Sequence, residues 1–312
     1  MLIYEKKEED NEIKKIIKNF TNEFLSLETK RSYFKDLILF FDFFKKINII
    51  FTHPSDVTRE HSLIYRDFLI KKYAPGTVHR RLVALRSFMK WCLYLQIIDK
   101  NPLELVKLPR CEVQNPTLAL SDAEVQAIFS LITFDTVKNA QQGLVLYFLL
   151  QLGLRRSELV SIKIKDFIED KDHFLLRVYG KGSKIRFIPI NNFLQKKIHE
   201  YFALTEKEKF FYSQEDYVFR VNPESKNPIH GTTVFRIVER FVKKANISKK
   251  IGAHSCRATV ISHLLDTQKI HIRDVAIFAG HSNIETTQRY DKRRDNLKNS
   301  AAYAVDYTET AE

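Results

Sequence analysis

The chain has 312 residues, 44% of them hydrophobic and 29% charged, which excludes a disordered chain and favours two domains that each bury a core. Its net charge is +13, with 21 Lys and Arg against 14 Asp and Glu in residues 1–110 and 30 against 24 in the rest. Basic charge on both domains indicates one polyanion held by both, although charge alone is equally compatible with a generically basic protein.

Residues 1–108 are predicted to form a helical domain. Apolar residues recur at helical spacing over residues 28–46 and 58–73, and residues 74–77 then interrupt the pattern, with Thr77 placed to cap the next helix. That helix has an apolar seam that steps by four and three residues: Val78, Leu82, Leu85, Met89 and Cys92. A basic stripe of His79, Arg86 and Lys90 lies beside the seam and is, by itself, typical of a solvated helix face.

A second domain is predicted over residues 119–312, after a linker at 109–118 that contains two prolines. Ser121 and Glu124 form a capping box, and the apolar helix over 143–152 should be buried. Residues 174–190 alternate as a β-hairpin, with Gly180–Ser183 at its tip and an apolar set of Leu176, Val178, Ile185 and Phe187. Five further helices are predicted over residues 193–203, 232–245, 254–265, 272–279 and 284–290. The expected fold class is therefore mainly α with a small β-sheet.

The cysteines and the apolar runs predict a soluble cytoplasmic protein. Cys92, Cys111 and Cys256 are widely spaced and include no Cys-x-x-Cys pair, so neither a disulfide framework nor a zinc site is indicated. The first ten residues turn acidic where a signal peptide would be apolar, and the longest apolar run, residues 144–150, is too short to span a membrane. We expect no membrane association.

The buried helix over 143–152 leads into Gly153-Leu154-Arg155-Arg156-Ser157-Glu158. Arg155 is either an exposed arginine at a helix end that pairs with Glu158, or a phosphate-binding group that Glu158 orients. The adjacent Arg156 leaves open which guanidinium points inward.

His254 and Arg257 lie three residues apart at the start of a predicted helix, so both side chains leave the same face. An arginine binds two phosphate oxygens in a fork, and a histidine exchanges a proton near neutral pH, so the pair suits a phosphate. A structural pair is the other reading of this spacing.

Lys181 lies between two glycines at the predicted hairpin tip, where the backbone can approach a ligand closely. A Walker-type nucleotide loop is excluded, because Leu175 and Gly182 occupy the positions that require glycine and a hydroxyl residue. A solvent-facing turn without function remains equally open.

Tyr290 is the best candidate for a nucleophile. Gly280 and His281 are expected to end one helix, and the next short helix brings Tyr290 near His281. A phenol has a pKa of about 10, so attack at neutral pH requires a base or nearby cations. Cys256 is expected in the core instead. Together the arginines, Lys181, the two histidines and the phenol of Tyr290 could break a phosphodiester without a metal.

The segments that contain Arg155, Lys181, His254 with Arg257, and His281 with Tyr290 follow one another in a fixed order. In this order and spacing, they closely resemble the tyrosine recombinase (phage integrase) family, in particular its Xer-type and integrase members. The resemblance covers most of the chain, and residues 77–110 are similar to the end of that family's helical core-binding domain. It implies a helical, SAM-like core-binding domain and a mixed α/β catalytic domain that close as a C-shaped clamp around duplex DNA.

The resemblance implies six catalytic residues: Arg155, Lys181, His254, Arg257, His281 and Tyr290. Tyr290 would attack the scissile phosphate to give a 3'-phosphotyrosine, with His254 taking its proton. The two arginines and His281 would bind the phosphate, the lysine would protonate the leaving 5'-oxygen, and Glu158 would support the cluster. No cofactor, ATP or metal is expected.

The resemblance also implies contacts with double-stranded DNA. The helix over 232–245 would be a groove or backbone element, and the candidate DNA-binding residues are His79, Arg80, Arg86, Lys90, Arg156, Lys184, Arg236, Arg240 and Lys243.

The expected activity is site-specific recombination through a Holliday junction, either for chromosome dimer resolution or for integration and excision of a mobile element. The apolar spacing of residues 300–307 implies a tail that docks on a neighbouring subunit, with a dimer on one site, a tetramer in synapsis and an accessory protein as a further partner. The expected location is the nucleoid. Two alternatives are DNA relaxation by a type IB topoisomerase-like enzyme and a non-catalytic DNA-binding accessory protein.

Overall fold

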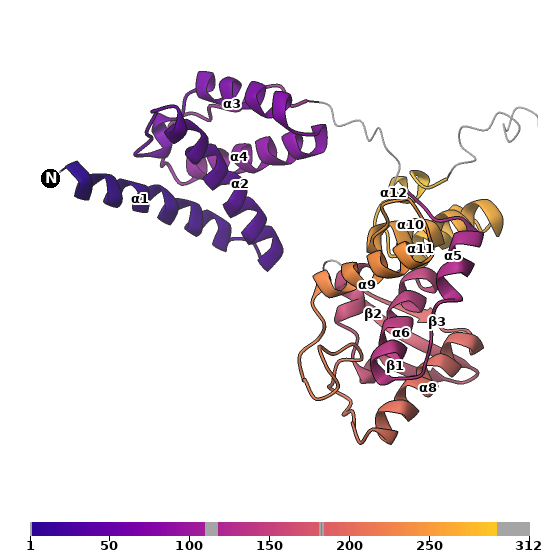
Figure 1. The fold of residues 1–312 in the computed structure, drawn as a ribbon. Helices are drawn as coiled ribbons and strands as arrows, with labels where there is room; N and C mark the ends of the chain where they lie inside the picture. Colours follow the sequence, from indigo (N-terminus) through magenta and orange to yellow (C-terminus); the bar gives the residue numbers. More distant parts are fainter. Residues whose placement is uncertain (1, 110–117, 181, 183, 292–312) are drawn as a thin grey trace, which may run out of the picture. The chain divides into compact units, whose positions relative to one another are not determined.

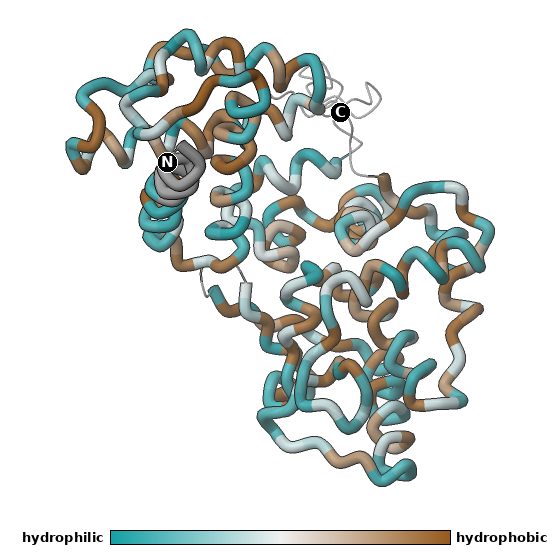
Figure 2. Tube along the Cα trace, turned by 60° about the vertical axis from the view of Figure 1, so that its left-hand side comes forward, coloured by the Kyte–Doolittle hydropathy of each residue, from teal (hydrophilic) through white to brown (hydrophobic). Residues whose placement is uncertain are grey.

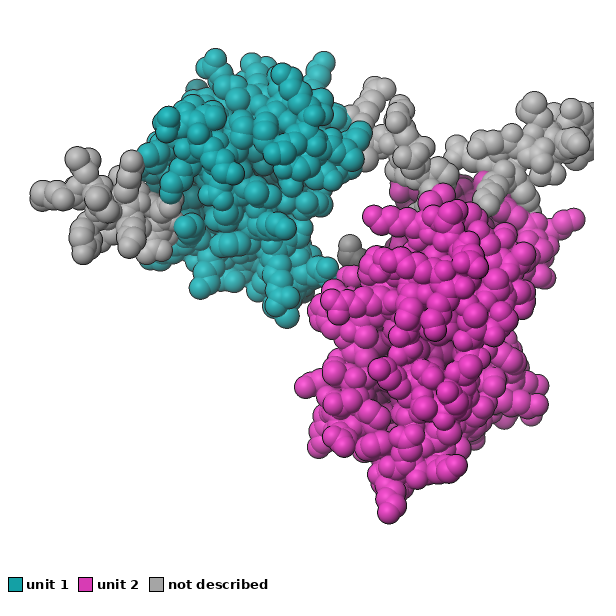
Figure 3. All heavy atoms as spheres, viewed as in Figure 1, with its two compact units in different colours: residues 1–114 teal, residues 115–312 magenta. Residues whose placement is uncertain are grey.

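The computed structural model describes residues 2–109, 118–180, 182 and 184–291, with side chains from residue 12 onward. The chain folds as two compact units, residues 1–114 and 115–312 (Figure 3). Within the described ranges helices predominate in both units, and the second also contains a three-stranded antiparallel sheet (Figure 1). The expected fold class, mainly α with a small β-sheet, is confirmed. The predicted linker falls, apart from its first and last residues, outside the described residues.

The N-terminal unit is built from helices around an aromatic core. Its elements are α1 (Leu2–Asn22), α2 (Leu27–Lys46), the 3-10 turn η1 (Pro54–Asp56), α3 (Arg59–Lys72) and α4 (Pro75–Tyr94). Phe40 is fully buried, and its ring contacts the rings of Phe44, Phe51 and Tyr65. Hydrophobic and hydrophilic residues alternate within single helices (Figure 2), as expected of helices with one buried face. The predicted seam of α4 is buried throughout.

Helix α4 begins earlier than the sequence predicted. Ala74 is its N-cap residue, with no side-chain hydrogen bond, and Pro75 occupies the first helical position. Proline fits there because its φ is already helical and its missing N–H would lack a partner in any case. The prediction that Thr77 caps this helix is wrong.

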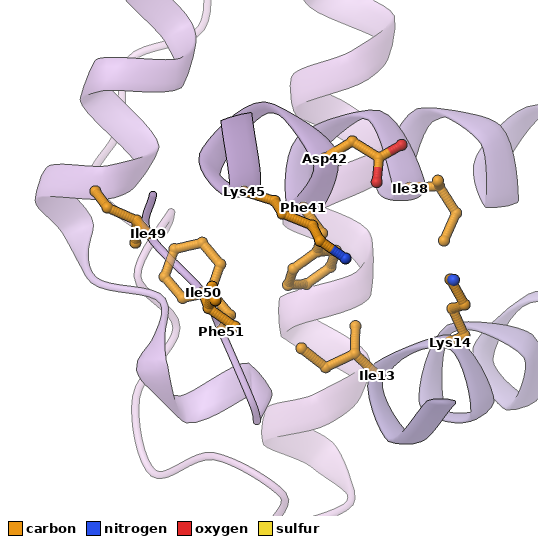
Figure 4. A pocket seen from close by; sticks show the side chains of 9 residues that line it. All are labelled: Ile13, Lys14, Ile38, Phe41, Asp42, Lys45, Ile49, Ile50 and Phe51. Carbon is orange, nitrogen blue, oxygen red and sulfur yellow. The ribbon is translucent and has the colours of Figure 1, made fainter. Parts of the chain in front are cut away.

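A small cavity lies between α1, α2 and residues 49–51 (Figure 4). It is lined by Ile13, Lys14, Ile38, Phe41, Asp42, Lys45, Ile49, Ile50 and Phe51. Its volume of about 30 Å³ admits a water molecule and no organic ligand.

The C-terminal unit is organised around α6 (Val137–Gln151), on which α5 (Asp122–Phe129), α8 (Asn192–Lys207), α9 (Gly231–Lys244) and α10 (Ala253–Ser262) pack. The remaining helical elements are α7 (Arg156–Val160), the 3-10 turn η2 (Ile164–Asp166), the π-helical turn η4 (His263–Thr267), α11 (Ile272–Ala279) and α12 (Glu285–Gln288). The predicted burial of residues 143–152 is confirmed, with only Gln151 partly exposed. The helix starts six residues earlier than predicted, because Thr136 caps it by accepting a hydrogen bond from the Asn139 N–H.

The antiparallel sheet has the order β1 (Phe167–Asp170), β2 (His173–Tyr179) and β3 (Ile185–Pro189). The predicted hairpin is therefore present, and the short strand β1 was missed. Leu176 and Val178 are buried as the alternation predicted, but Ile185 and Phe187 are more than half exposed. The register pairs Val178 with Arg186, so an arginine occupies the inward face of β3.

No helix in the described part of the chain is long and apolar enough to cross a membrane.

Candidate active site

A sharp turn after α6 delivers Arg155 to the site. Gly153 has φ +58°, a left-handed conformation that suits glycine, and it directly follows Leu152, the C-cap residue of α6. Arg155 is left as the N-cap residue of α7. Its Nη1 donates to Glu158 Oε1 at 2.7 Å and its Nη2 donates to the Gly280 carbonyl at 3.0 Å.

The adjacent Arg156 takes another direction. It is exposed, and its guanidinium lies beside Gly231 at the start of α9, where a β-carbon would lie 2.8 Å from Arg156 Nε. The sequence left open which arginine of the pair joins the other predicted residues. The structure brings Arg155 to them and leaves Arg156 outside.

Arg257, on α10, is almost fully buried. Its Nη1 donates to the Gly153 carbonyl at 2.7 Å, and its Nη2 donates to the Ala279 carbonyl. The carbonyls at the end of a helix lack helical N–H partners and carry the negative end of the helix dipole. Arg155 and Arg257 therefore bind successive carbonyls at the C-terminal end of α11.

A third guanidinium, which the sequence interpretation missed, completes this arrangement. Arg186 on β3 donates from Nε to the Phe278 carbonyl at 3.1 Å and from Nη1 and Nη2 to the two carboxylate oxygens of Glu158, each at 2.9 Å. Glu158 is buried, and its pKa is lowered to about 2 because the Arg186 and Arg155 hydrogen bonds outweigh the effect of burial. The inward direction of Arg186 follows from the pairing of β3 with β2, which places Arg186 opposite the buried Val178. The sequence alone does not show this pairing.

The cluster carries more positive than negative charge. Glu158 is the carboxylate that pairs with Arg155 and Arg186, and its negative charge also acts on the nearby Arg257. Burial, followed by the charge of Arg155, lowers the pKa of Arg257 to about 10, so this guanidinium is still charged at pH 7. A bound anion would offset the mutual repulsion of the three cations.

Tyr290 lies at the edge of this cluster beside His254. The distance from Tyr290 Oη to His254 Nε2 is 3.4 Å. Burial and then the positive charges of Arg257 and Arg155 lower the pKa of His254, so its imidazole is neutral at pH 7 and can accept a proton. Burial raises the pKa of Tyr290, while the nearby arginines oppose that effect.

His281 is held by a buried hydroxyl. Its Nδ1 lies 2.8 Å from Thr287 Oγ1, and its ring stacks near that of Tyr290 at a centroid distance of 6.3 Å. Burial and the charges of Arg257 and Arg155 lower the pKa of His281 to about 4. At pH 7 it is neutral and has one ring N–H to donate.

Acid should destabilise the C-terminal unit through His281. Its pKa is about 4 in the folded chain and 6.5 when unperturbed, so the unfolded chain binds more protons between these values. The free energy of unfolding should therefore fall as the pH drops from 6.5 towards 4. Urea unfolding at a series of pH values checks this: the loss should be smaller in His281→Gln and unchanged in His173→Gln, an exposed histidine on β2. Equal losses in all three proteins would contradict the expectation.

Lys181 lies outside the described residues. Gly180 N–H donates to the Lys184 carbonyl at 2.7 Å and closes the hairpin tip. A β-carbon on Gly180 would lie 3.8 Å from Glu158 Oε1, so the base of the tip adjoins the arginine cluster. Lys184 is exposed.

The basic residues predicted on α9 are exposed but differ in their partners. Arg240 donates from Nη2 to the Gln142 side chain, and Lys243 pairs with Glu239 at 3.2 Å. Arg236 lines an open pocket with residues of α6 and of the segment before α9.

In the N-terminal unit, most of the predicted DNA contacts also have partners within the chain. Arg80 donates to Asp36 and Ser32, Arg86 donates to the Val106 carbonyl, and His79 lies 3.4 Å from the Pro109 carbonyl. Lys90 is exposed. Within the basic stripe on α4, His79 and Arg86 therefore contact backbone carbonyls of the chain itself.

The described site brings together Arg155, Glu158, His254, Arg257, His281 and Tyr290, as the sequence predicted, and adds Arg186 and Thr287. Its cations, neutral imidazoles and phenol can bind a phosphate and transfer it to an oxygen. No group of three or more His, Cys, Asp or Glu residues suited to a metal ion occurs among the residues with described positions.

Sequence comparisons agree with this chemistry. The model of the phage integrase family matches residues 119–296. A tyrosine recombinase of Pseudothermotoga lettingae is 33% identical over 238 residues, which cover 75% of this chain and 78% of that protein. The tyrosine recombinase XerC of Bacillus licheniformis is 29% identical over 289 residues, 88% of this chain and 91% of that protein.

Solved structures share the fold. XerH site-specific recombinase bound to a palindromic difH substrate, in a post-cleavage complex, has a TM-score of 0.71 at 18% identity and covers 89% of this chain and 80% of that one. A lambda integrase dimer bound to a COC' core site has a TM-score of 0.66 at 14% identity, covering 93% and 96%. With the family model matching more than half of the chain, this protein belongs to the phage integrase family and is a tyrosine recombinase, an enzyme that cuts and rejoins DNA strands.

Proposed function

We propose that this tyrosine recombinase cuts double-stranded DNA at a specific site with Tyr290 and exchanges strands through a Holliday junction. The observation that supports it most is the Tyr290 hydroxyl, 3.4 Å from a neutral His254 and beside a cluster with excess positive charge. A phenol, a base and phosphate-binding cations are the groups that transesterification at phosphorus needs.

In the proposed first step, Tyr290 Oη attacks the scissile phosphorus and its proton passes to His254 Nε2. The bond between phosphorus and the 5'-oxygen breaks, and Lys181 donates a proton to that oxygen. The products are a 3'-phosphotyrosine and a free 5'-hydroxyl. Attack of a 5'-hydroxyl on the phosphotyrosine reverses the step and rejoins the strand, so the chemistry needs neither ATP nor a cofactor.

Arg155 and Arg257 are proposed to bind the non-bridging oxygens in this step. A guanidinium has five N–H donors. Arg155 and Arg257 each use two of them in the hydrogen bonds described above, so each has three left for a phosphate. His281 would add a hydrogen bond from Nε2 when Nδ1 accepts from the Thr287 hydroxyl. Losing one donor to a developing oxyanion typically costs about 3–4 kcal/mol.

The proposed function also involves DNA contacts and an assembly of subunits. Of the residues predicted to contact DNA, Lys90, Arg156, Lys184 and Arg236 are exposed, and no hydrogen bond or ion pair engages their side chains among the described contacts, so we propose that these four reach DNA. The lambda integrase structure contains a dimer bound to a core site, which supports a dimer on one site here. We extend this proposal to a tetramer in synapsis, held by contacts through residues 292–312, which lie outside the described part. The proposal also includes closure of the two domains around DNA, an accessory protein as a further partner, and a location at the nucleoid.

A selection for covalent adducts tests the proposed function. The protein is incubated with a library of duplexes whose central bases are randomised and which carry a nick two nucleotides beyond each candidate scissile phosphate. Cleavage releases a dinucleotide that diffuses away, so the phosphotyrosine cannot religate. Adducts that survive denaturant are collected and sequenced to define the preferred duplex.

Recovery of adducts with one enriched sequence, and recombinants between two plasmid copies of it, is the expected result. A complete lack of adducts would overturn the proposal and favour the non-catalytic DNA-binding alternative. Adducts with relaxation of supercoils but no recombinants would favour the topoisomerase-like alternative.

A further inference from the structure

We propose that Arg186 is a positioning residue of the cleavage reaction, which acts by holding Glu158 so that Glu158 in turn fixes the guanidinium of Arg155. The inference rests on the proposed function. Arg186 itself is directed at protein groups: its three donor nitrogens bind Glu158 and the Phe278 carbonyl, and its side chain is only 12% exposed.

The hydrogen bonds around Glu158 carry the first step of the argument. Oε1 accepts from Arg155 Nη1 at 2.7 Å and from Arg186 Nη1 at 2.9 Å, while Oε2 accepts from the Arg155 backbone N–H at 2.8 Å and from Arg186 Nη2 at 2.9 Å. Each oxygen is thus shared between the two arginines. Arg186 binds in the bidentate geometry that fixes the plane of a carboxylate, so it also fixes the direction in which Glu158 holds Arg155.

The second step concerns the end of α11. Gly280 has φ +64° and its carbonyl accepts from Arg155 Nη2, while a β-carbon built on it would lie 3.0 Å from Arg186 Nη1. Arg186 therefore lies against the same residue that Arg155 binds. Through the Phe278 carbonyl it also ties β3 to the segment that leads to His281.

Geometry of this kind matters for rate more than for binding. A displacement of about 1 Å in a group that binds the transition state can cost about 100-fold in rate. Removal of Arg186 leaves Arg155 as the one partner side chain of Glu158 among the described residues, so Arg155 and Glu158 can rotate together away from the phosphate. The expected defect is therefore in charge stabilisation at the non-bridging oxygens.

The test uses Arg186→Gln in the full chain, with Arg177→Gln as a matched control. Arg177 lies on the neighbouring strand β2 and likewise pairs with a buried carboxylate, that of Asp166, at 3.2 Å. Single-turnover cleavage is measured on the duplex selected above, with a normal scissile phosphate and with a methylphosphonate at the same position. The methylphosphonate has a neutral methyl group in place of one charged oxygen and so depends less on a guanidinium.

We expect Arg186→Gln to slow cleavage of the normal phosphate by about 100-fold and cleavage of the methylphosphonate by far less. Arg177→Gln should affect the two substrates equally. In an Arg155→Ala background, Arg186→Gln should add less than about threefold, because its effect passes through Arg155. Arg186→Lys keeps the charge but cannot reach all three acceptors, so it should show a smaller defect with the same substrate dependence, and it carries the test if the Gln variant is unstable.

Equal slowing of both substrates by the Arg186 variants, or full additivity with Arg155→Ala, would overturn the inference and leave Arg186 a purely structural residue. Unchanged cleavage by both Arg186 variants would also overturn it. These outcomes differ from failure of the proposed function, in which the wild-type protein itself forms no adduct.

Discussion

Tyr290→Phe is expected to abolish the covalent protein–DNA adduct while leaving the fold and DNA binding intact. The substitution removes Oη alone, the atom that lies 3.4 Å from His254 Nε2. The ring keeps its place against the apolar cluster around Leu265 and its stacking on His281, and the Tyr290 carbonyl still accepts from Ser262 Oγ at 3.2 Å. The free energy of unfolding should change by about 1 kcal/mol or less.

The measurement is adduct formation on the selected nicked duplex, followed by mass spectrometry of the peptide that retains the nucleotide. Tyr212→Phe is a suitable control, since its hydroxyl forms a 2.7 Å hydrogen bond with Tyr201 outside the cluster. The control should retain full adduct formation. An adduct in Tyr290→Phe, or a nucleotide on another residue, would assign the nucleophile elsewhere.

Local rules were sufficient for much of the fold. The seam of α4, the capping box at Ser121 and the buried helix α6 follow from spacing and capping that act within a few residues. Glycine likewise marks the left-handed positions at Gly153 and Gly280 that place Arg155 and His281. These features depend on neighbours in the sequence, so the sequence displays them.

The failures at the site occur where a residue is placed by a distant partner. The inward direction of Arg186 depends on the pairing of β3 with β2 and on Glu158, 28 residues away. The choice between Arg155 and Arg156 depends on the carbonyl of Gly280, 125 residues away. The basic stripe on α4 was ambiguous for the same reason, because the Val106 carbonyl that binds Arg86 cannot be assigned from helical periodicity.

Arg257→Gln is expected to cost about 10²- to 10³-fold in cleavage rate, because it removes a buried charge from the place where, in the proposed mechanism, the transition state gains negative charge. The loss should not come from unfolding. Burial and then Arg155 disfavour this charge in the folded protein, so removing it is favourable. The glutamine amide can still donate to one of the two carbonyls that Arg257 binds, so the substitution loses the hydrogen bond to the other. These effects offset each other, so the free energy of unfolding should stay within about 2 kcal/mol of the wild-type value.

A matched control and a second readout separate this role from a structural one. Arg220 is also buried and donates to two backbone carbonyls, those of Tyr217 and Pro223, outside the cluster, so Arg220→Gln should lose stability but retain cleavage in the folded fraction. After burial, the charge of Arg257 is the next largest cause of the lowered pKa values of His254 and His281. NMR titration of Arg257→Gln should therefore show both pKa values raised. Unchanged histidine pKa values would mean that Arg257 does not set the field at the site, and a cleavage rate near that of the wild type would remove it from the proposed mechanism.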